Sequence, residues 1–195
     1  ASCKRSGSPP PIEPTNRCEP ERFAGFASPA DAYARYAHGI NEHAWCDGIT
    51  TFAPPSRPAV LIANFKGLCS LAGARGPKQT QYREHLQAFC RKQALDCASE
   101  ARVTAAILDV TNGEDLDRGL PALQQNANKT PESMYIDLMT ELTAVDAALL
   151  SPFELPLRDV VVTGDRASGT APQRDGSHRK LAFVKQPKGW LLSYE

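Results

Sequence analysis

The amino-acid sequence predicts an α+β domain in which helices from the first part of the chain pack on a curled antiparallel sheet formed by its last part. Two observations lead to this prediction. Amphipathic segments with helical spacing begin at capping signatures such as Ser28-Pro29 and Thr130-Pro131. After Pro156 the chain changes to short β-branched and apolar segments separated by glycine-containing turns. Helices followed by a run of strands are typical of the α+β class.

Composition limits the size and the partners of this domain. The chain has 195 residues, and Lys+Arg 22 balance Asp+Glu 22. A balanced charge attracts neither nucleic acid nor an anionic membrane surface, so we expect no nucleic-acid partner. Hydrophobic residues make up 42% of the chain, which suffices for one core and one domain. No apolar run approaches the ~20 residues of a membrane-spanning helix, so membrane contact is expected only through a lipid anchor.

Residues 1–27 are predicted to be a lipid anchor and a proline-rich tether, and residues 28–195 the folded domain. Cys3 follows two small residues, and this triplet resembles the end of a bacterial lipobox, in which the cysteine carries the acyl chains. Alternatively the two residues before Cys3 are a cloning remnant, which leaves the same inference. The prolines from Pro9 to Pro20 favour an extended spacer. The predicted location is therefore the bacterial cell envelope, either periplasmic or surface-exposed.

The first predicted helix begins at Ser28-Pro29 and continues to about His43. Asp31 lies where the acid of a capping box would bind the open backbone donors. A short helix is expected over residues 45–52, where Pro54-Pro55 ends it. The apolar stripe of the first helix consists of Tyr33, Tyr36, Ala37, Ile40 and Ala44.

Two further helices are expected to begin at Pro58 and at Pro77, with the turn between them marked by Gly73 and Gly76. Each has one apolar face, so both should pack on a common core. These faces carry Leu61, Phe65 and Leu68 in the first of the two, and Tyr82, Leu86, Phe89 and Cys90 in the second.

The middle of the chain ends in the cleanest amphipathic helix. Residues 97–109 permit a strand by alternation or a helix by their alanines, and we favour a helix. Residues 112–115 are predicted to be a loop. Thr130-Pro131 repeats the cap-plus-proline signature, and Pro152 and Pro156 end the helix that follows. Its apolar face consists of Tyr135, Leu138, Met139, Leu142, Val145 and Leu149.

The last segments predict an antiparallel meander. Residues 160–163 and 181–184 are apolar and rich in β-branched or aromatic side chains, and Trp190 opens a third such segment. Gly164-Asp165, Asp175-Gly176 and Pro187-Lys188-Gly189 are turn signals at the intervals that a meander requires.

Five cysteines remain when Cys3 is set aside, which is typical of an oxidising compartment. Their spacing lacks the paired Cys-x-x-Cys pattern of zinc sites, so disulfides are favoured and no metal is expected. An odd number leaves one cysteine outside two predicted bridges. The candidates are Cys18, Cys46, Cys69, Cys90 and Cys97.

The pairing of these cysteines is constrained by the predicted helices. A bridge from Cys18 into the domain would pin the end of the tether. Cys90 and Cys97 would lie about 10 Å apart in one continuous helix, at ~1.5 Å per residue, so this pair requires the helix to break near Asp96. We prefer a bridge from Cys69 to Cys90 or Cys97.

The two ends of the domain resemble the NTF2-like superfamily, a cone-shaped α+β fold shared by nuclear transport factor 2 and ketosteroid isomerase. Residues 28–36 through to Phe52-Ala53-Pro54 are similar to the first two helices of that family. Residues 160–167, 181–185 and 189–192 are similar to its final strands. Residues 66–130 depart from the family in being longer, more helical and richer in cysteine. The resemblance implies a sheet curled into a cone, with a carboxylate or histidine in the pocket of those members that are enzymes.

Candidate chemical groups near the first helices are Asp31, His38, His43 and Asp47. They can supply a general base to a cone pocket, or they can lie on the solvated side of the tyrosine stripe, which we favour. Neither a nucleophile elbow, nor a metal-binding helix motif, nor a phosphate loop occurs, so no catalytic residue and no cofactor is assigned. The aromatic side chains that can line a pocket, or belong to the core, are Tyr33, Tyr36, Trp45 and Trp190.

Basic residues offer a further possibility. Arg57, and the cluster formed by Arg174, His178, Arg179 and Lys180, can bind an anionic partner, but a solvated hairpin is favoured. His85 is expected at the surface.

The function expected from these observations is that of a noncatalytic envelope module that binds a protein or a small apolar ligand. An immunity-type lipoprotein that neutralises a toxin is one alternative, and an enzyme with a cone pocket is the other. An open cavity of several hundred cubic ångströms, the usual scale of a ligand site, with Asp31 or His38 pointing into it would favour the enzyme.

Overall fold

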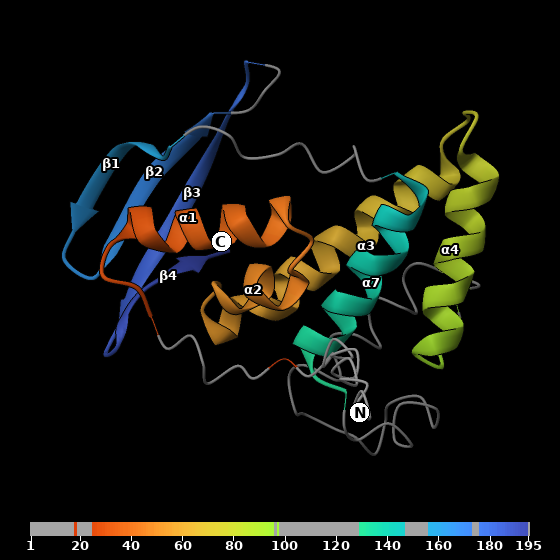
Figure 1. The fold of residues 1–195 in the computed structure, drawn as a ribbon, viewed down its shortest axis with the longest axis horizontal. Coiled ribbons are helices and arrows are strands. Elements are labelled where there is room, and N and C mark those ends of the chain that lie inside the picture. The colour runs from red at the N-terminus through yellow and green to blue at the C-terminus, as the bar shows by residue number, and fades with distance from the viewer. Residues whose placement is uncertain are drawn as a thin grey trace, which may run out of the picture.

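The computed structural model describes residue 18, residues 25–95, residue 97, and residues 129–146, 156–172 and 176–194. Within these ranges the chain is an α+β protein, with helices first and a four-stranded antiparallel sheet at the C-terminal end (Figure 1). The predicted fold class is therefore confirmed at this level. Outside the described residues lie Cys3, most of the tether, Leu149, and residues 98–109 of the helix favoured from Cys97 onwards.

The helices predicted from Pro29, Pro58 and Pro131 begin within one residue of these prolines. The helix predicted from Pro77 begins two residues later, at Gln79. Ser28 caps the first helix by accepting a hydrogen bond from the Asp31 backbone N–H at 3.1 Å. Thr130 and Ser133 form a reciprocal capping box at the start of the last one. The first helix ends at Asn41, slightly before the expected end, and His43 has a positive φ of 55°. The helices are α1 (Pro29–Asn41), α2 (Trp45–Thr50), the 3-10 turn η2 (Pro54–Ser56), α3 (Arg57–Gly73), α4 (Gln79–Lys92) and α7 (Pro131–Val145).

The sheet is the predicted meander. Its strands are β1 (Arg158–Thr163), β2 (Arg166–Pro172), β3 (His178–Gln186) and β4 (Gly189–Ser193), in the order β1-β2-β3-β4. The small residues of β2 have a packing role, because a Cβ atom on Gly169 would lie 2.9 Å from Cγ of Leu157. Leu157 therefore lies across β2 at the point where the sheet carries no side chain.

Chain segments from the start of the domain close the outer edge of β4. Phe26 and Trp190 exchange backbone hydrogen bonds of 3.0 and 2.8 Å. Leu192 accepts from the Ala53 N–H at 2.8 Å and donates to the Thr51 carbonyl at 2.9 Å. The two ends of the α1–α2 segment are thus fixed to the last strand of the sheet.

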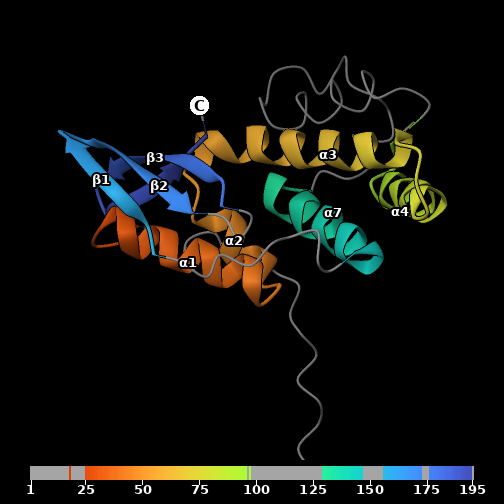
Figure 2. The same cartoon turned by 90° about the horizontal axis from the view of Figure 1, so that it is seen from above.

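The helices form two groups beside each other. Helices α1 and α2 lie next to the sheet, whereas α3, α4 and α7 pack on one another, with α4 at the end of the molecule farthest from β1 (Figures 1 and 2). The core is continuous between the groups, since it includes Ile49 of α2, Phe65 of α3, Leu138 of α7 and Phe183 of β3. None of the helices in the described ranges is long and apolar enough to cross a membrane.

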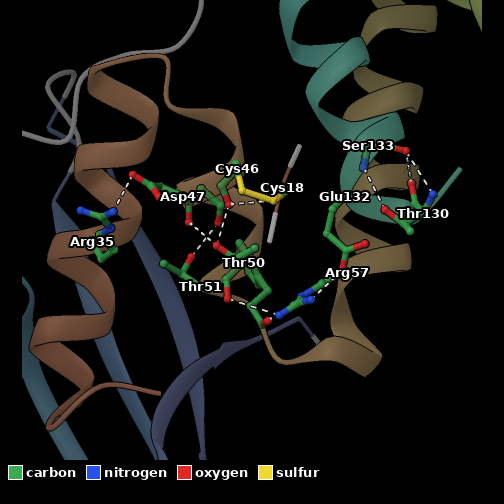
Figure 3. The surroundings of a disulfide bond; sticks show 12 residues. Cys18, Arg35, Cys46, Asp47, Thr50, Thr51, Arg57, Thr130, Glu132 and Ser133 are labelled. Atoms are coloured by element: carbon green, nitrogen blue, oxygen red, sulfur yellow. Dashed lines mark hydrogen bonds and ion pairs between the residues drawn. A yellow bond between two sulfur atoms is a disulfide. The ribbon is translucent and has the colours of Figure 1, made fainter. Parts of the chain in front are cut away.

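Polar contacts fix α7 against its neighbours. Arg57 Nη1 lies 2.6 Å from Glu132 Oε1, and both side chains are buried (Figure 3). Three other ion pairs, which are more exposed to solvent, join the start, middle and end of α4 to α7. These pairs are Lys78–Asp146, His85–Glu141 and Lys92–Asp137, with separations of 2.7, 2.7 and 2.6 Å.

Two disulfides occur among the described residues. Cys18 is bonded to Cys46 at the start of α2, with Cα atoms 5.4 Å apart, so the end of the tether is attached to the domain (Figure 3). Cys90 is bonded to Cys97, with Cα atoms 6.0 Å apart. Cys69 takes part in neither disulfide.

The preferred bridge from Cys69 was therefore wrong. The pair Cys90–Cys97 forms because α4 ends at Lys92 and Ala94 adopts a positive φ of 53°. The chain then turns back, and the Leu95 N–H donates to the Cys90 carbonyl at 2.8 Å. This is the break in the helix that the pair was predicted to require.

Candidate functional site: a groove along α1

A groove of about 660 Å³ runs along the outer face of α1. Its apolar surface comes from Ala30, Ala34 and Ala37 on the helix, and from Pro156 and Leu157 on the segment that leads into β1. Successive positions of one helix face line the groove because residues three and four apart lie above one another. Leu157 forms the opposite wall because it is held over β2 at Gly169.

Polar groups lie along the groove. The polar residues that line the groove are Asp31, Tyr33, His38, Asn41 and Glu42. The Asp31 carboxylate accepts a hydrogen bond of 2.7 Å from the Ser28 hydroxyl, so it also belongs to the helix cap. Asp31 and His38 are separated by about 10 Å along the helix axis, at ~1.5 Å per residue. The two groups predicted as catalytic candidates therefore line one cavity without meeting at one point in it.

Tyr33, which lines the groove, is one of three buried tyrosines that influence one another. Tyr33 is 3% exposed, and burial, together with the nearby Tyr36 phenol, raises the pKa of Tyr33. Burial also raises the pKa of Tyr36, which the charge of Arg179 and its hydrogen bond only partly offset. Burial raises the pKa of Tyr135 as well, helped by Tyr36. All three phenols are thus held in the neutral form, as polar groups of the core.

The predicted aromatic residues do not form a common pocket. Tyr33, Tyr36, Trp45 and Trp190 are all buried, and of these four only Tyr33 lines the groove. Trp45 stacks on His43 with ring centroids 4.9 Å apart, and Lys185 lies 5.9 Å from the Trp190 ring. Three of the four side chains therefore have ordinary packing roles.

The other charged candidates are distributed over separate contacts. Asp47 forms an ion pair of 2.8 Å with Arg35 (Figure 3). His85, expected at the surface, pairs with Glu141 at 2.7 Å. Arg57, considered for anion binding, is buried beside Glu132. Among His178, Arg179 and Lys180, which are exposed on β3, Arg179 bonds to Tyr36, and Arg174 lies outside the described residues.

One wall of the groove is not predicted from the sequence. Pro156 indicates only the end of a helix, and Leu157 belongs to no periodic pattern. A signal was present in the small residues of β2, since a glycine inside a strand indicates a close approach by another part of the chain.

Comparisons of the chain with protein-family models, with curated proteins and with solved structures found no match. The NTF2-like resemblance therefore stays a prediction. Among the described residues no cluster of three or more His, Cys, Asp or Glu side chains could hold a metal ion.

Proposed function

We propose that this protein is a noncatalytic binding module that takes a small apolar ligand into the groove along α1. The observation that carries the proposal is a cavity of about 660 Å³ with alanines and Leu157 in its lining. This volume lies within the ~300–1,000 Å³ of small-molecule sites. Asp31 and Glu42 lie at the two ends of the helical wall, so the groove suits a neutral or cationic molecule better than an anionic one.

A groove-filling substitution tests this proposal. In Ala34→Trp an exposed alanine in the middle of the groove wall is replaced by an indole that occupies the cavity. Ala74→Trp is the matched control, because Ala74 is also exposed but follows the C-terminal end of α3. With Nile red, a neutral apolar dye, we expect saturable fluorescence enhancement in the wild type and in Ala74→Trp. Ala34→Trp should weaken dye binding at least about tenfold.

Equal dye binding by Ala34→Trp and Ala74→Trp would contradict the groove as the site. A charge test is independent of steric effects. Glu42→Lys should strengthen binding of the anionic dye 1-anilinonaphthalene-8-sulfonate while leaving Nile red binding unchanged. Thermal unfolding of each variant shows whether the fold is retained, and Lys at this C-terminal cap is favourable to the helix.

A pocket enzyme is the second candidate, because both Asp31 and His38 line an open cavity of the size that was expected to favour it. We rank it lower, since both side chains come from one helix, about two turns apart, and Asp31 is engaged by Ser28. The discriminating experiment uses the molecule extracted from protein purified from the producing cells. If the wild type converts the extracted molecule and His38→Ala does not, the protein is an enzyme. Recovery of the unchanged molecule from both proteins would support binding alone.

We also propose that the protein is an envelope lipoprotein anchored through Cys3. The two disulfides fit a secreted or envelope protein. Expression from its own gene in a bacterial host should give a membrane-associated product with acyl groups on Cys3, detected by mass spectrometry. Cys3→Ser should abolish both, and Cys69→Ser is the control. A wild-type protein without acyl mass would contradict the anchor.

For the fold, we propose an NTF2-like cone. The proposal is supported by the order of the elements, because α1 and α2 precede a four-stranded antiparallel meander and lie beside it (Figure 2). A crystal structure in which the sheet is flat and leaves α1 outside its concave face would contradict it.

A further inference from the structure

The two outer edges of the sheet differ in how they are covered. The edge at β4 is closed by backbone hydrogen bonds to Phe26 and to residues 51–53. Over the described parts of the chain, nothing pairs with the outer edge of β1. Figure 1 shows β1 at the rim of the molecule, on the side away from α3, α4 and α7. An uncovered edge is a row of backbone donors and acceptors available to another strand.

The same strand exposes an apolar surface. Val160, Val161 and Val162 are 40%, 60% and 54% exposed, and every residue of β1 is exposed. Monomeric proteins usually protect such edges with lysine, proline or a covering loop. Among the described residues, the protection of β1 is limited to its start, where Asp159 has a φ of 51° and the register shifts.

We propose that β1 pairs antiparallel with β1 of a second copy of this chain, across a twofold axis at Val161. Thr163 and Arg166 are partners across a two-residue turn, and residues that flank such a turn share hydrogen bonds. By alternation Val161 also bonds to β2, whereas the backbone groups of Val162 and Val160 point to the open edge. A twofold axis at Val161 then bonds Val162 of each copy to Val160 of the other.

The run of three valines selects this register. Sliding the copies by two residues in one direction places Val161 opposite Thr163 and moves Val160 opposite Gly164 of the turn. Sliding them in the other direction places Arg158 and Asp159 opposite valines. Only the register centred on Val161 sets all three valines of each strand against valines of the other.

The coverage of β4 limits the assembly to two copies. A twofold contact uses the same strand on both subunits, so a β1–β1 pair occupies the open edge of each. The outer edges of the joined sheets are then the two β4 edges, which are already bonded. The bulge at the start of β1 confines regular pairing to a few residues, so the interface is smaller than the ~1,600 Å² of a standard one and we expect a weak dimer.

Disulfide trapping tests the register. At a non-hydrogen-bonded pair the facing Cα atoms lie ~4.5 Å apart, within the ~4.4–6.8 Å that a disulfide spans. Val161→Cys should therefore form a covalent dimer under mild oxidation. Ser168→Cys is the matched control, because Ser168 is the exposed partner of Val161 on β2. Its counterpart in the dimer would be about 14 Å away, at ~4.8 Å per strand spacing. The wild type reports any cross-linking through Cys69 or Cys3.

Sedimentation of the full chain without added cysteine tests the assembly. We expect a reversible dimer, with no larger species, that Val161→Lys weakens at least about tenfold and that Val161→Thr weakens less. The proposal is overturned by a wild type that stays monomeric up to about 1 mM, by a dimer unaffected by Val161→Lys, or by equal trapping of Val161→Cys and Ser168→Cys. If Val161→Lys fails to fold, the two cysteine variants decide alone. Dye binding in the α1 groove is measured separately, so either proposal can fail without the other.

Discussion

Arg57 and Glu132 lie 75 positions apart in the sequence, yet they form a buried ion pair that joins the first turn of α3 to the first turn of α7. Arg57 also donates from Nε to the Phe52 carbonyl at 3.0 Å and from Nη2 to the Thr50 carbonyl at 3.4 Å. One guanidinium therefore connects the end of α2, the start of α3 and α7 (Figure 3).

Breaking this pair should destabilise the protein strongly. Arg57→Met leaves the buried Glu132 carboxylate and two backbone carbonyl groups without their partner, and Glu132→Ala leaves the buried Arg57 charge unpaired. We expect each substitution to lower the free energy of unfolding by about 3–5 kcal/mol. Lys66→Met, at an exposed position of α3, should change it by no more than about 0.5 kcal/mol. Urea denaturation measures all three. A loss below about 1 kcal/mol in Glu132→Ala would show that the pair contributes little.

The same pair predicts a pH dependence of stability. Burial alone would raise the pKa of Glu132, but hydrogen bonds, chiefly from Arg57, hold it below its ordinary value of 4.5. A carboxyl with a depressed folded-state pKa stabilises the fold above its unfolded value and loses that contribution as the pH falls through the folded value. The stability advantage of the wild type over Glu132→Gln should therefore be constant near neutral pH and shrink below pH 4.5. An advantage that is unchanged at pH 3 would contradict this assignment.

The disulfides should contribute unequally. Cys18 and Cys46 are 28 residues apart, and Cys90 and Cys97 are 7 apart. Loop-closure entropy gives about 3.6 kcal/mol for the longer loop and about 2.4 kcal/mol for the shorter one. The paired replacement of Cys18 and Cys46 by serine should lower the melting temperature more than that of Cys90 and Cys97. The reverse order would indicate that native contacts, rather than loop length, set the contribution of these bridges.

The contact between Gly25 and Gly189 should tolerate no side chain. Gly189 has a φ of +140°, and a Cβ atom there would lie 2.5 Å from the Phe26 carbonyl oxygen. In Gly189→Ala, backbone strain should lower the free energy of unfolding by about 1–3 kcal/mol, and the clash of the Cβ atom should add to this loss. The substitution should also separate residues 25–26 from β4. Gly67→Ala, in the middle of α3 with open space around it, should stabilise by about 0.5–1 kcal/mol. Hydrogen exchange at the Phe26 and Trp190 amides measures the local effect. We expect both amides to lose their protection in Gly189→Ala, and retained protection would contradict the prediction.

Local sequence features determined where most elements begin. A serine or threonine followed by proline starts a helix because the side chain caps an open N–H and the ring sets φ, and both effects act within one turn. This explains why the starts of α1 and α7 were predicted from Ser28-Pro29 and Thr130-Pro131. The meander was predicted for the same reason, because the turn signals act on adjacent strands.

Only the tertiary structure decided which distant residues meet. The bridge from Cys18 to Cys46, the burial of Arg57 beside Glu132, and the position of Leu157 over Gly169 join elements whose spacing along the chain carries no periodic signal. The groove along α1 depends on the last of these contacts, so the sequence identified Asp31 and His38 as candidates but not the wall that faces them. The exposure of the β1 valines could not be predicted from the sequence for a related reason. A β-branched run predicts a strand from its own backbone preference, whereas its place at an uncovered edge depends on which segments close the rest of the sheet.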